Sequence, residues 1–324
     1  MTRRRWYSLQ ATLLLGMGGV AFCALNIGPS PVTLFQILSA TDVAILWQAR
    51  LPRILLALAV GMALGGAGAS YQALLRNPLA DPYILGVSGG AALGSAIGIG
   101  AGLPFPFIAL AAFVASLGTI GLILMIARGD AVHTTYRLLL TGVVCNAFAF
   151  ACIMAVQAVI PIERSHEILV VLMGNLTLAD LQITWWVFGI VIVGLIILMR
   201  HARALDAWTL GAETAASLGI DPARLQRTIF LAGSLVVGAS VAASGLIGFV
   251  GLIVPHAARL IVGHRHHLLL PLSACGGGVF LVVADTVARS ALHGGDYTTE
   301  LPVGVVTALV GAPLFLWLLR KRTA

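Results

Sequence analysis

Long apolar runs, separated by short polar stretches, divide this chain into ten segments. They lie near residues 8–28, 51–73, 84–103, 106–127, 137–159, 183–200, 228–247, 249–263, 268–292 and 303–319. Most are close to the roughly 20 apolar residues that an α-helix needs to cross a bilayer. The seventh and eighth run together through "SGLIGFVGLIVPH", so nine helices is the competing count. The pattern predicts an all-α integral membrane protein of about ten transmembrane helices, forming one domain over residues 1–324.

Composition supports a membrane protein. The chain is 59% hydrophobic and 10% charged, with a mean hydropathy of +1.01. A soluble domain is expected to be about 45–50% apolar and about 25% charged. The apolar run after "TRRRW" is longer than the core of a secretion signal and lacks a small-x-small cleavage site, so we interpret it as the first membrane helix.

The basic residues favour ten helices over nine. Ten helices with both termini in the cytoplasm place most of the arginines, and the lone lysine, inside: Arg3, Arg4, Arg5, Arg76, Arg128, Arg137, Arg200, Arg203, Arg224, Arg227, Arg259, Arg265, Arg320, Lys321 and Arg322. Arg50, Arg53, Arg164 and Arg289 would lie outside. This is the excess that the positive-inside rule requires, whereas nine helices would separate "RRR" from "RKR". The net charge of +7 follows from this topology and gives no argument for nucleic-acid binding.

Several kinds of chemistry are excluded or disfavoured by the residues present. The only lysine, Lys321, lies four residues from the end, so the chain has no G-x-x-x-x-G-K-[ST] phosphate loop, and any ATP must be bound by another chain. The four cysteines have no metal-like spacing, and we expect His264, His266 and His267 to form a solvated cytoplasmic turn. Asp285 lies within an apolar segment with Arg289 at i+4; we favour an intrahelical ion pair over a proton relay.

Two stretches of the chain resemble each other at an offset of 177 residues. Seven positions of residues 60–86 are identical in residues 237–263: Val60, Gly61, Gly68, Pro78, Ala80, Ile84 and Gly86 match Val237, Gly238, Gly245, Pro255, Ala257, Ile261 and Gly263. In a ten-helix chain this offset spans five helices, which is the arrangement of an inverted repeat in transporters. Chance in a Gly- and Ala-rich sequence is the alternative.

A polar stretch at 205–226, "LDAWTLGAETAASLGIDPARLQ", interrupts the apolar pattern. Ala212 to Leu218 favours a helix, and Gly219 is a typical C-terminal stop. Asp221 followed by Pro222 is typical of the N-cap and first residue of another helix. Two short helices joined at a glycine on the cytoplasmic side would form a rigid projection suited to a partner protein.

Here the chain resembles a known family. "LGAETAASLGID" (210–221) is similar to the coupling segment of FecCD-type permeases, the membrane subunits of bacterial ABC importers for ferric siderophores, haem and vitamin B12. Other blocks agree in order: "RLPR" (50–53), "RNPLADPYILGVSGGAALG" (76–94), "RLLLTG" (137–142), "GFVGLIVPHAARL" (248–260) and "ELPVGVVTALVGAPLFLWLL" (300–319). The resemblance spans nearly the whole chain.

The resemblance implies a multi-pass permease of the bacterial inner membrane. Two copies would form the pathway, two separate ATPase subunits would bind ATP and Mg and dock on the coupling segments, and a periplasmic binding protein would deliver cargo. No cofactor is implied for this chain. By motif, the residues of the cytoplasmic gate would be Asn77, Leu79, Thr135 and Tyr136, with turn-capping as the alternative role of Asn77. Those of ATPase coupling would be Gly211, Ala212, Glu213, Ala216, Leu218 and Gly219. Those of binding-protein docking would be Arg50, Arg53 and Arg289; the alternatives are interfacial anchoring for Arg50 and Arg53 and a pairing with Asp285 alone for Arg289.

Two other functions compete with this interpretation. A stand-alone secondary transporter or channel would work without ATP and leave the polar projection without a role. A membrane enzyme is disfavoured because no cluster of acids, histidines or cysteines lies at one membrane depth. The cargo stays open between iron chelates and vitamin B12. Arg164 and His166 in "PIERSHEI" would suit haem propionates or iron, with solvated loop charges as the alternative, and the polar loop 293–300 has no assigned role.

Overall fold

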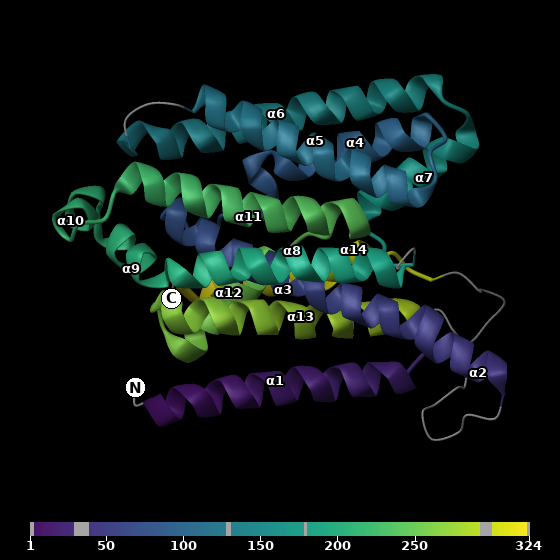
Figure 1. Ribbon diagram of the computed structural model, residues 1–324, viewed down its shortest axis with the longest axis horizontal. Helices are drawn as coiled ribbons and strands as arrows, with labels where there is room; N and C mark the ends of the chain where they lie inside the picture. Colours follow the sequence, from purple (N-terminus) through teal and green to yellow (C-terminus); the bar gives the residue numbers. More distant parts are fainter. Residues whose placement is uncertain (1–2, 29–38, 128–130, 178–179, 292–299, 323–324) are drawn as a thin grey trace.

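Ten apolar helices run roughly along the long axis of the molecule (Figure 1) in the computed structural model, which describes residues 3–28, 39–127, 131–177, 180–291 and 300–322. They are α1 (Arg3–Asn26), α3 (Leu51–Leu74), α4 (Val87–Gly100), α5 (Phe105–Ile126), α6 (Ala131–Val159), α8 (Leu181–Arg200), α11 (Pro222–Ser244), α12 (Val250–Val262), α13 (His266–Ser290) and α14 (Val303–Arg322). Over their described side chains, six are long and apolar enough to cross a membrane, and the other four give shorter apolar stretches. The predicted all-α membrane fold is confirmed.

Shorter helices connect or extend these ten. Two of them, α2 (Ala40–Ala44) and η1 (Ile45–Arg50), lead into α3, and η2 (Pro82–Leu85) precedes α4. The amphipathic helix α7 (Ile162–Met173), which packs against α4, was not predicted, because charged residues in its first half interrupt the apolar run in the sequence. The last two are α9 (Ala202–Leu210) and α10 (Ala212–Ser217).

The helix α3 lies at the centre of the bundle. Nearly all its residues are buried, and it packs against α13, α11, α8 and α12. Its approach to α13 depends on glycine, because a Cβ on Gly61 would overlap the carbonyl group of Gly277, and one on Gly277 would overlap that of Gly61. Small residues of this kind let transmembrane helices pack backbone to backbone. By contrast, α5 and α6 expose large apolar side chains, as a lipid-facing surface requires.

The helix α4 is shorter than the sequence predicted, because the chain breaks inside the bundle before it, and a second break precedes α12. Residues 75–86 separate α3 from α4, and residues 245–249 separate α11 from α12. The two breaks contact each other, since the hydroxyl of Tyr83 accepts a hydrogen bond from the Ile247 amide (2.9 Å). Asn146 of α6 also contacts the first break, because its Nδ2 donates to the Tyr83 carbonyl (2.7 Å). Such bonds satisfy the non-helical backbone that a membrane protein tolerates only inside the protein.

The proposed internal repeat is not supported in the register that the sequence indicated. Pro78 lies in the loop after α3, whereas its counterpart Pro255 lies inside α12. Matched columns therefore adopt different secondary structures. A repeat at the level of five helices stays a prediction.

The two ends of the bundle differ. At one end, α1 begins and α14 ends close to α9 and α10 (Figure 1), and we call this the α10 end. The helix α7 lies at the opposite end, which we call the α7 end. An even number of spans brings both termini to one end, so this arrangement agrees with ten helices rather than nine.

Candidate gate and coupling site

The segment predicted to couple to a partner forms a projection at the α10 end, built from α9, Gly211 and α10 (Figure 1). The two short helices are joined at Gly211 (φ +144°), not at Gly219 as the sequence indicated. Gly219 (φ +80°) ends α10, and the helix after it is the long α11, which begins at Pro222 rather than near 228. The Asp221 carboxylate accepts hydrogen bonds from the amides of Ala223 (2.9 Å) and Arg224 (3.1 Å), which confirms the predicted cap.

Four of the six residues of α10 are exposed, and Ala212 is half-buried. Ala215 is fully buried, and the amide of Ile220 donates to its carbonyl (3.0 Å), which closes the turn after α10. All the predicted coupling residues are at least partly exposed: Gly211, Ala212, Glu213, Ala216, Leu218 and Gly219. Leu218 has 65% of its surface exposed. Its side chain is therefore accessible to another protein.

The predicted gate residues Asn77 and Leu79 lie in the loop after α3. The side-chain oxygen of Asn77 accepts a hydrogen bond from the Leu79 amide (2.9 Å), so the turn-capping role is observed directly. Tyr136, near the start of α6, is 67% exposed. Thr135 also lies in α6, but its side chain is outside the described part of the structure.

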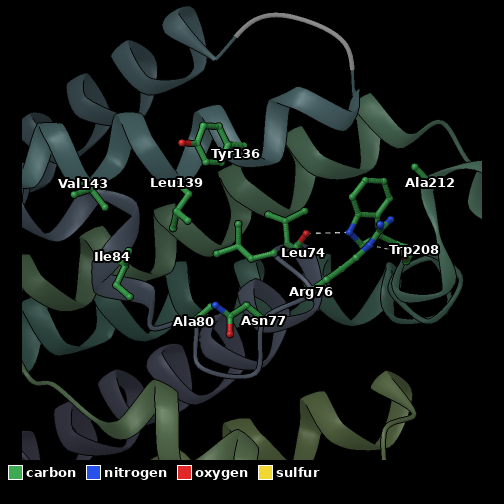
Figure 2. A pocket seen from close by; sticks show the side chains of 11 residues that line it. Leu74, Arg76, Asn77, Ala80, Ile84, Tyr136, Leu139, Val143, Trp208 and Ala212 are labelled. Atoms are coloured by element: carbon green, nitrogen blue, oxygen red, sulfur yellow. Dashed lines mark hydrogen bonds between the residues drawn. The ribbon is translucent and has the colours of Figure 1, made fainter.

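A cavity of about 470 Å³ brings gate and coupling residues together at the α10 end (Figure 2). Asn77 lines it from the loop after α3, Tyr136 from α6, and Ala212 from α10. Leu79 is not among the lining residues. The loop between α3 and η2 (residues 75–81), which we call the gate loop after its predicted role, and the predicted coupling segment therefore face one space, although they are more than 100 residues apart in the sequence.

Two residues that sequence reasoning missed join these parts. Trp208 of α9 is buried, and its indole N–H donates to the Leu74 carbonyl at the end of α3 (3.0 Å). Arg76 Nε donates to the Trp208 carbonyl (3.0 Å), and its guanidinium carbon lies 4.3 Å from the centre of the indole ring (Figure 2). The available signal was that Trp208 is the one aromatic residue of the stretch 205–226, because a tryptophan needs burial and a partner for its N–H.

A second contact fixes α9 to the start of α13. The Asp206 carboxylate accepts a hydrogen bond from the His266 amide (2.9 Å), and His266 Nδ1 lies 2.6 Å from the same oxygen. His266 is buried, so the prediction of a solvated histidine turn is wrong for this residue, although His264 is exposed. Within the described residues, no group of three or more His, Cys, Asp or Glu side chains is placed to hold a metal ion.

The loop between α3 and α4 also holds a perturbed acid. Asp81 Oδ1 accepts a hydrogen bond from the Tyr83 amide (2.8 Å) at the start of η2. Burial raises the pKa of Asp81 to about 6, because removal from water disfavours the charged carboxylate. Asp81 lies in the same loop as Asn77.

The three predicted docking arginines lie toward the α7 end and are buried. Arg289 Nε contacts Asp285 (3.1 Å), which confirms the predicted intrahelical pair. Arg53 also contacts Asp285 (2.9 Å) and reaches Glu300 (2.6 Å). Arg50 donates to the Leu25 carbonyl (2.7 Å). Interfacial anchoring is therefore wrong for these side chains, since they are enclosed by protein, and their docking role stays a prediction.

A second cavity, of about 410 Å³, lies beside α7. His166, Glu167, Asn175 and Thr177 supply polar groups to its lining, and α4, α5 and α11 supply mainly apolar ones. Arg164 does not line it; its guanidinium donates to the Gly100 carbonyl at the end of α4 (2.8 Å). The loop 293–300, to which the sequence assigned no role, lies outside the described residues except for Glu300.

Comparison with known proteins finds relatives that match most of the chain. Residues 12–321 match the FecCD transport family. The chain is 40% identical over 313 residues to the cobalamin import system permease protein BtuC of Halobacterium salinarum, covering 94% of this chain and 81% of the relative. It is 37% identical over 281 residues to the hemin transport system permease protein HmuU of Yersinia pestis, covering 84% and 82%. A solved inward-facing putative metal-chelate type ABC transporter superimposes with a TM-score of 0.87 at 32% identity, covering 97% of this chain and 99% of that one.

Proposed function

The chain belongs to the FecCD transport family and is the permease subunit of an ABC importer, and we propose that its cargo is a corrinoid such as vitamin B12. It does not itself catalyse ATP hydrolysis; an ATPase and a binding protein are its partners. The observation that carries the cargo proposal is the similarity to a cobalamin permease over 94% of this chain.

The charges near α7 favour a corrinoid over haem. Haem carries two propionates, which need cationic partners, whereas the periphery of cobalamin carries mainly neutral amides. Among its lining residues, the α7-end cavity offers His166, Glu167, Asn175 and Thr177 but no lysine or arginine. Arg164 already donates to a backbone carbonyl, and Arg53 and Arg289 already have carboxylate partners. The carboxylate of Glu167 would repel a propionate, whereas both it and the amide of Asn175 can pair with the amides of a corrinoid.

The absorption spectrum of the partner binding protein, isolated with its cargo, tests this proposal. We expect corrinoid bands in the visible region. A Soret band would overturn the proposal and identify haem, the second candidate, which is supported by the similarity to a hemin permease. A spectrum with neither would indicate a ferric siderophore and also overturn it.

We also propose the arrangement of the complete importer. Two copies of this chain form one pathway, each with one ATPase, in the bacterial inner membrane. The α10 end faces the cytoplasm, and both termini lie there with it. The excess of arginine in the loops of that end supports this orientation.

In this arrangement α10 is the contact for the ATPase. Gly211, Ala212, Glu213, Ala216, Leu218 and Gly219 would lie in or beside a groove of that subunit. The exposure of Leu218 supports this role. The residues Asn77, Leu79, Thr135 and Tyr136 from both copies would narrow the cytoplasmic exit, which the shared cavity of Asn77 and Tyr136 supports.

Docking of the binding protein at the α7 end would involve Arg50, Arg53 and Arg289. Burial adds a condition to this proposal, because Arg53 already contacts Asp285 and Glu300. A glutamate of the binding protein would have to replace Glu300, which is 27% exposed at its side chain and is therefore the more accessible partner. Docking would then proceed by exchange of one carboxylate for another.

A further inference from the structure

The side chain of Trp208 fastens the coupling segment to the end of the central helix. Only 3% of this residue is exposed, and its indole N–H donates to the Leu74 carbonyl at 3.0 Å. Leu74 is the last residue of α3, so its carbonyl has no partner within the helix. The indole supplies that partner. A movement of α9 would therefore also move the end of α3, where the gate loop begins.

Arg76 makes the return contact from the gate loop. Its Nε donates to the Trp208 carbonyl at 3.0 Å, while its guanidinium lies over the indole ring at 4.3 Å (Figure 2). The backbone of Arg76 has φ +49°, in the left-handed region that residues with a Cβ seldom adopt. Two backbone hydrogen bonds that end α3 hold this conformation, from the Arg76 amide to the Ala73 carbonyl (3.1 Å) and from the Asn77 amide to the Gln72 carbonyl (3.0 Å), and the two contacts with Trp208 add to them. Asn77 follows directly in the chain.

The helix α9 is also joined to two other elements. Asp206 fixes the same helix to the start of α13 through His266, and Gly211 joins it to the exposed α10. Ala212, the first residue of α10, lines the cavity that Asn77 and Tyr136 also line (Figure 2). One short helix thus lies between the exposed projection and the gate loop, with fixed contacts on both sides.

We propose that Arg76 and Trp208 transmit movement of the coupling segment to the gate loop, as positioning residues rather than as part of the pathway. This inference rests on the proposed roles of α10 and Asn77. When the ATPase subunit displaces α10, α9 moves with it, and the two hydrogen bonds and the stacked guanidinium carry residues 74–77 along. Breaking the Arg76–Trp208 link should let α10 move without moving Asn77.

The test uses the assembled transporter in proteoliposomes, with cyanocobalamin as the probe. Trp208→Phe retains an apolar ring but loses the indole N–H, and Arg76→Gln removes the guanidinium. Arg200→Gln is the matched control, since Arg200 is exposed at the end of α8 and the structure assigns it no contact with Trp208. We expect each link variant to lower cyanocobalamin uptake per ATP hydrolysed by about tenfold, within the usual range of coupling between sites. Hydrolysis stimulated by the binding protein should stay within about twofold of the wild type.

Two further measurements separate transmission from loss of structure. The double variant should be no worse than either single one, because the two residues act in one link. Spin labels at Leu79 and Arg203, in a background without the native cysteines, should keep their intrachain distance across nucleotide states in the wild type. In Trp208→Phe that distance should change when ATP binds.

Wild-type uptake per ATP in both single variants, or an unchanged label distance in Trp208→Phe, would overturn the link. Additive losses in the double variant would also overturn it. A wild type that hydrolyses ATP in response to its binding protein but takes up no cyanocobalamin would refute the proposed cargo alone. The label distances would then decide the link by themselves.

Discussion

Replacement of Gly219 by valine should uncouple ATP hydrolysis from transport. Gly219 has φ +80°, and a Cβ placed on it would meet no atom within 4 Å, so the cost of the change comes from the backbone rather than from packing. Holding a non-glycine residue in that region costs roughly 1–3 kcal/mol. Every 1.4 kcal/mol is about tenfold in population, so the native turn after α10 should become about 5- to 140-fold less populated. Since Gly219 lies in the proposed ATPase contact, the turn that presents Leu218 is the part disturbed.

Gly263 offers a matched control for this variant. It has φ +77°, and a Cβ placed on it would likewise meet no atom within 4 Å, but it ends α12 rather than α10. Gly263→Val should carry at least as large a backbone cost without uncoupling, because its ψ of −158° lies in a region that is essentially confined to glycine. Gly219→Asn should retain coupling, because asparagine tolerates the left-handed region. The assay is uptake per ATP hydrolysed in proteoliposomes, with insertion checked by size-exclusion chromatography. Wild-type coupling in Gly219→Val, or equal losses in Gly219→Val and Gly263→Val, would refute the reasoning.

Three further predictions address the gate, the docking surface and the buried acid. Cysteine at position 135, in a background without Cys23, Cys145, Cys152 and Cys275, should cross-link the two copies in some nucleotide states, because a disulfide needs Cα atoms within about 7 Å; no cross-link in any state would exclude this position from the two-fold axis. Arg53→Glu should slow docking of the binding protein and reduce the salt dependence of the docking rate, and a Glu→Lys change on the binding protein should partly restore that rate. Unchanged docking rates and salt slopes in Arg50→Glu, Arg53→Glu and Arg289→Glu alike would contradict the docking role. Asp81→Asn should raise the melting temperature at pH 7.5 more than at pH 4.5. The pKa of Asp81 in the folded protein is about 6, above the usual 3.8, so the stability of the wild type falls as pH rises between these two values, and the amide removes that loss. Equal shifts of the melting temperature at both pH values would contradict the burial of this carboxylate.

The helices were predictable from the sequence because lipid imposes a local requirement. Each span needs a continuous apolar run, and a run such as 106–127 can be read without knowledge of its neighbours. The same criterion missed α7, whose 12 residues include Glu163, Arg164, His166 and Glu167. It also overestimated α4, since the apolar residues of η2 are continuous with those of the helix in the sequence but not in the fold.

The contacts of the site depend on residues that are distant in the sequence. Arg76 and Trp208 are 132 positions apart, and Arg53 and Glu300 are 247 apart. No spacing rule connects such pairs, so Arg76 was counted only as one more cytoplasmic charge. Asp285 and Arg289 were paired correctly because four residues is one helical turn. Arg53 and Glu300 belong to the same cluster, but their contacts depend on the packing of α3 against α13 and could not be predicted from spacing.

Uptake of radiolabelled cyanocobalamin into proteoliposomes tests the central claim most directly. The vesicles would contain this permease with its ATPase, and the binding protein would be supplied on the side of the α7 end. We expect accumulation that requires both ATP and the binding protein and that excess unlabelled hemin does not inhibit. Accumulation without ATP, or ATP-dependent accumulation of hemin in place of cyanocobalamin, would contradict the account.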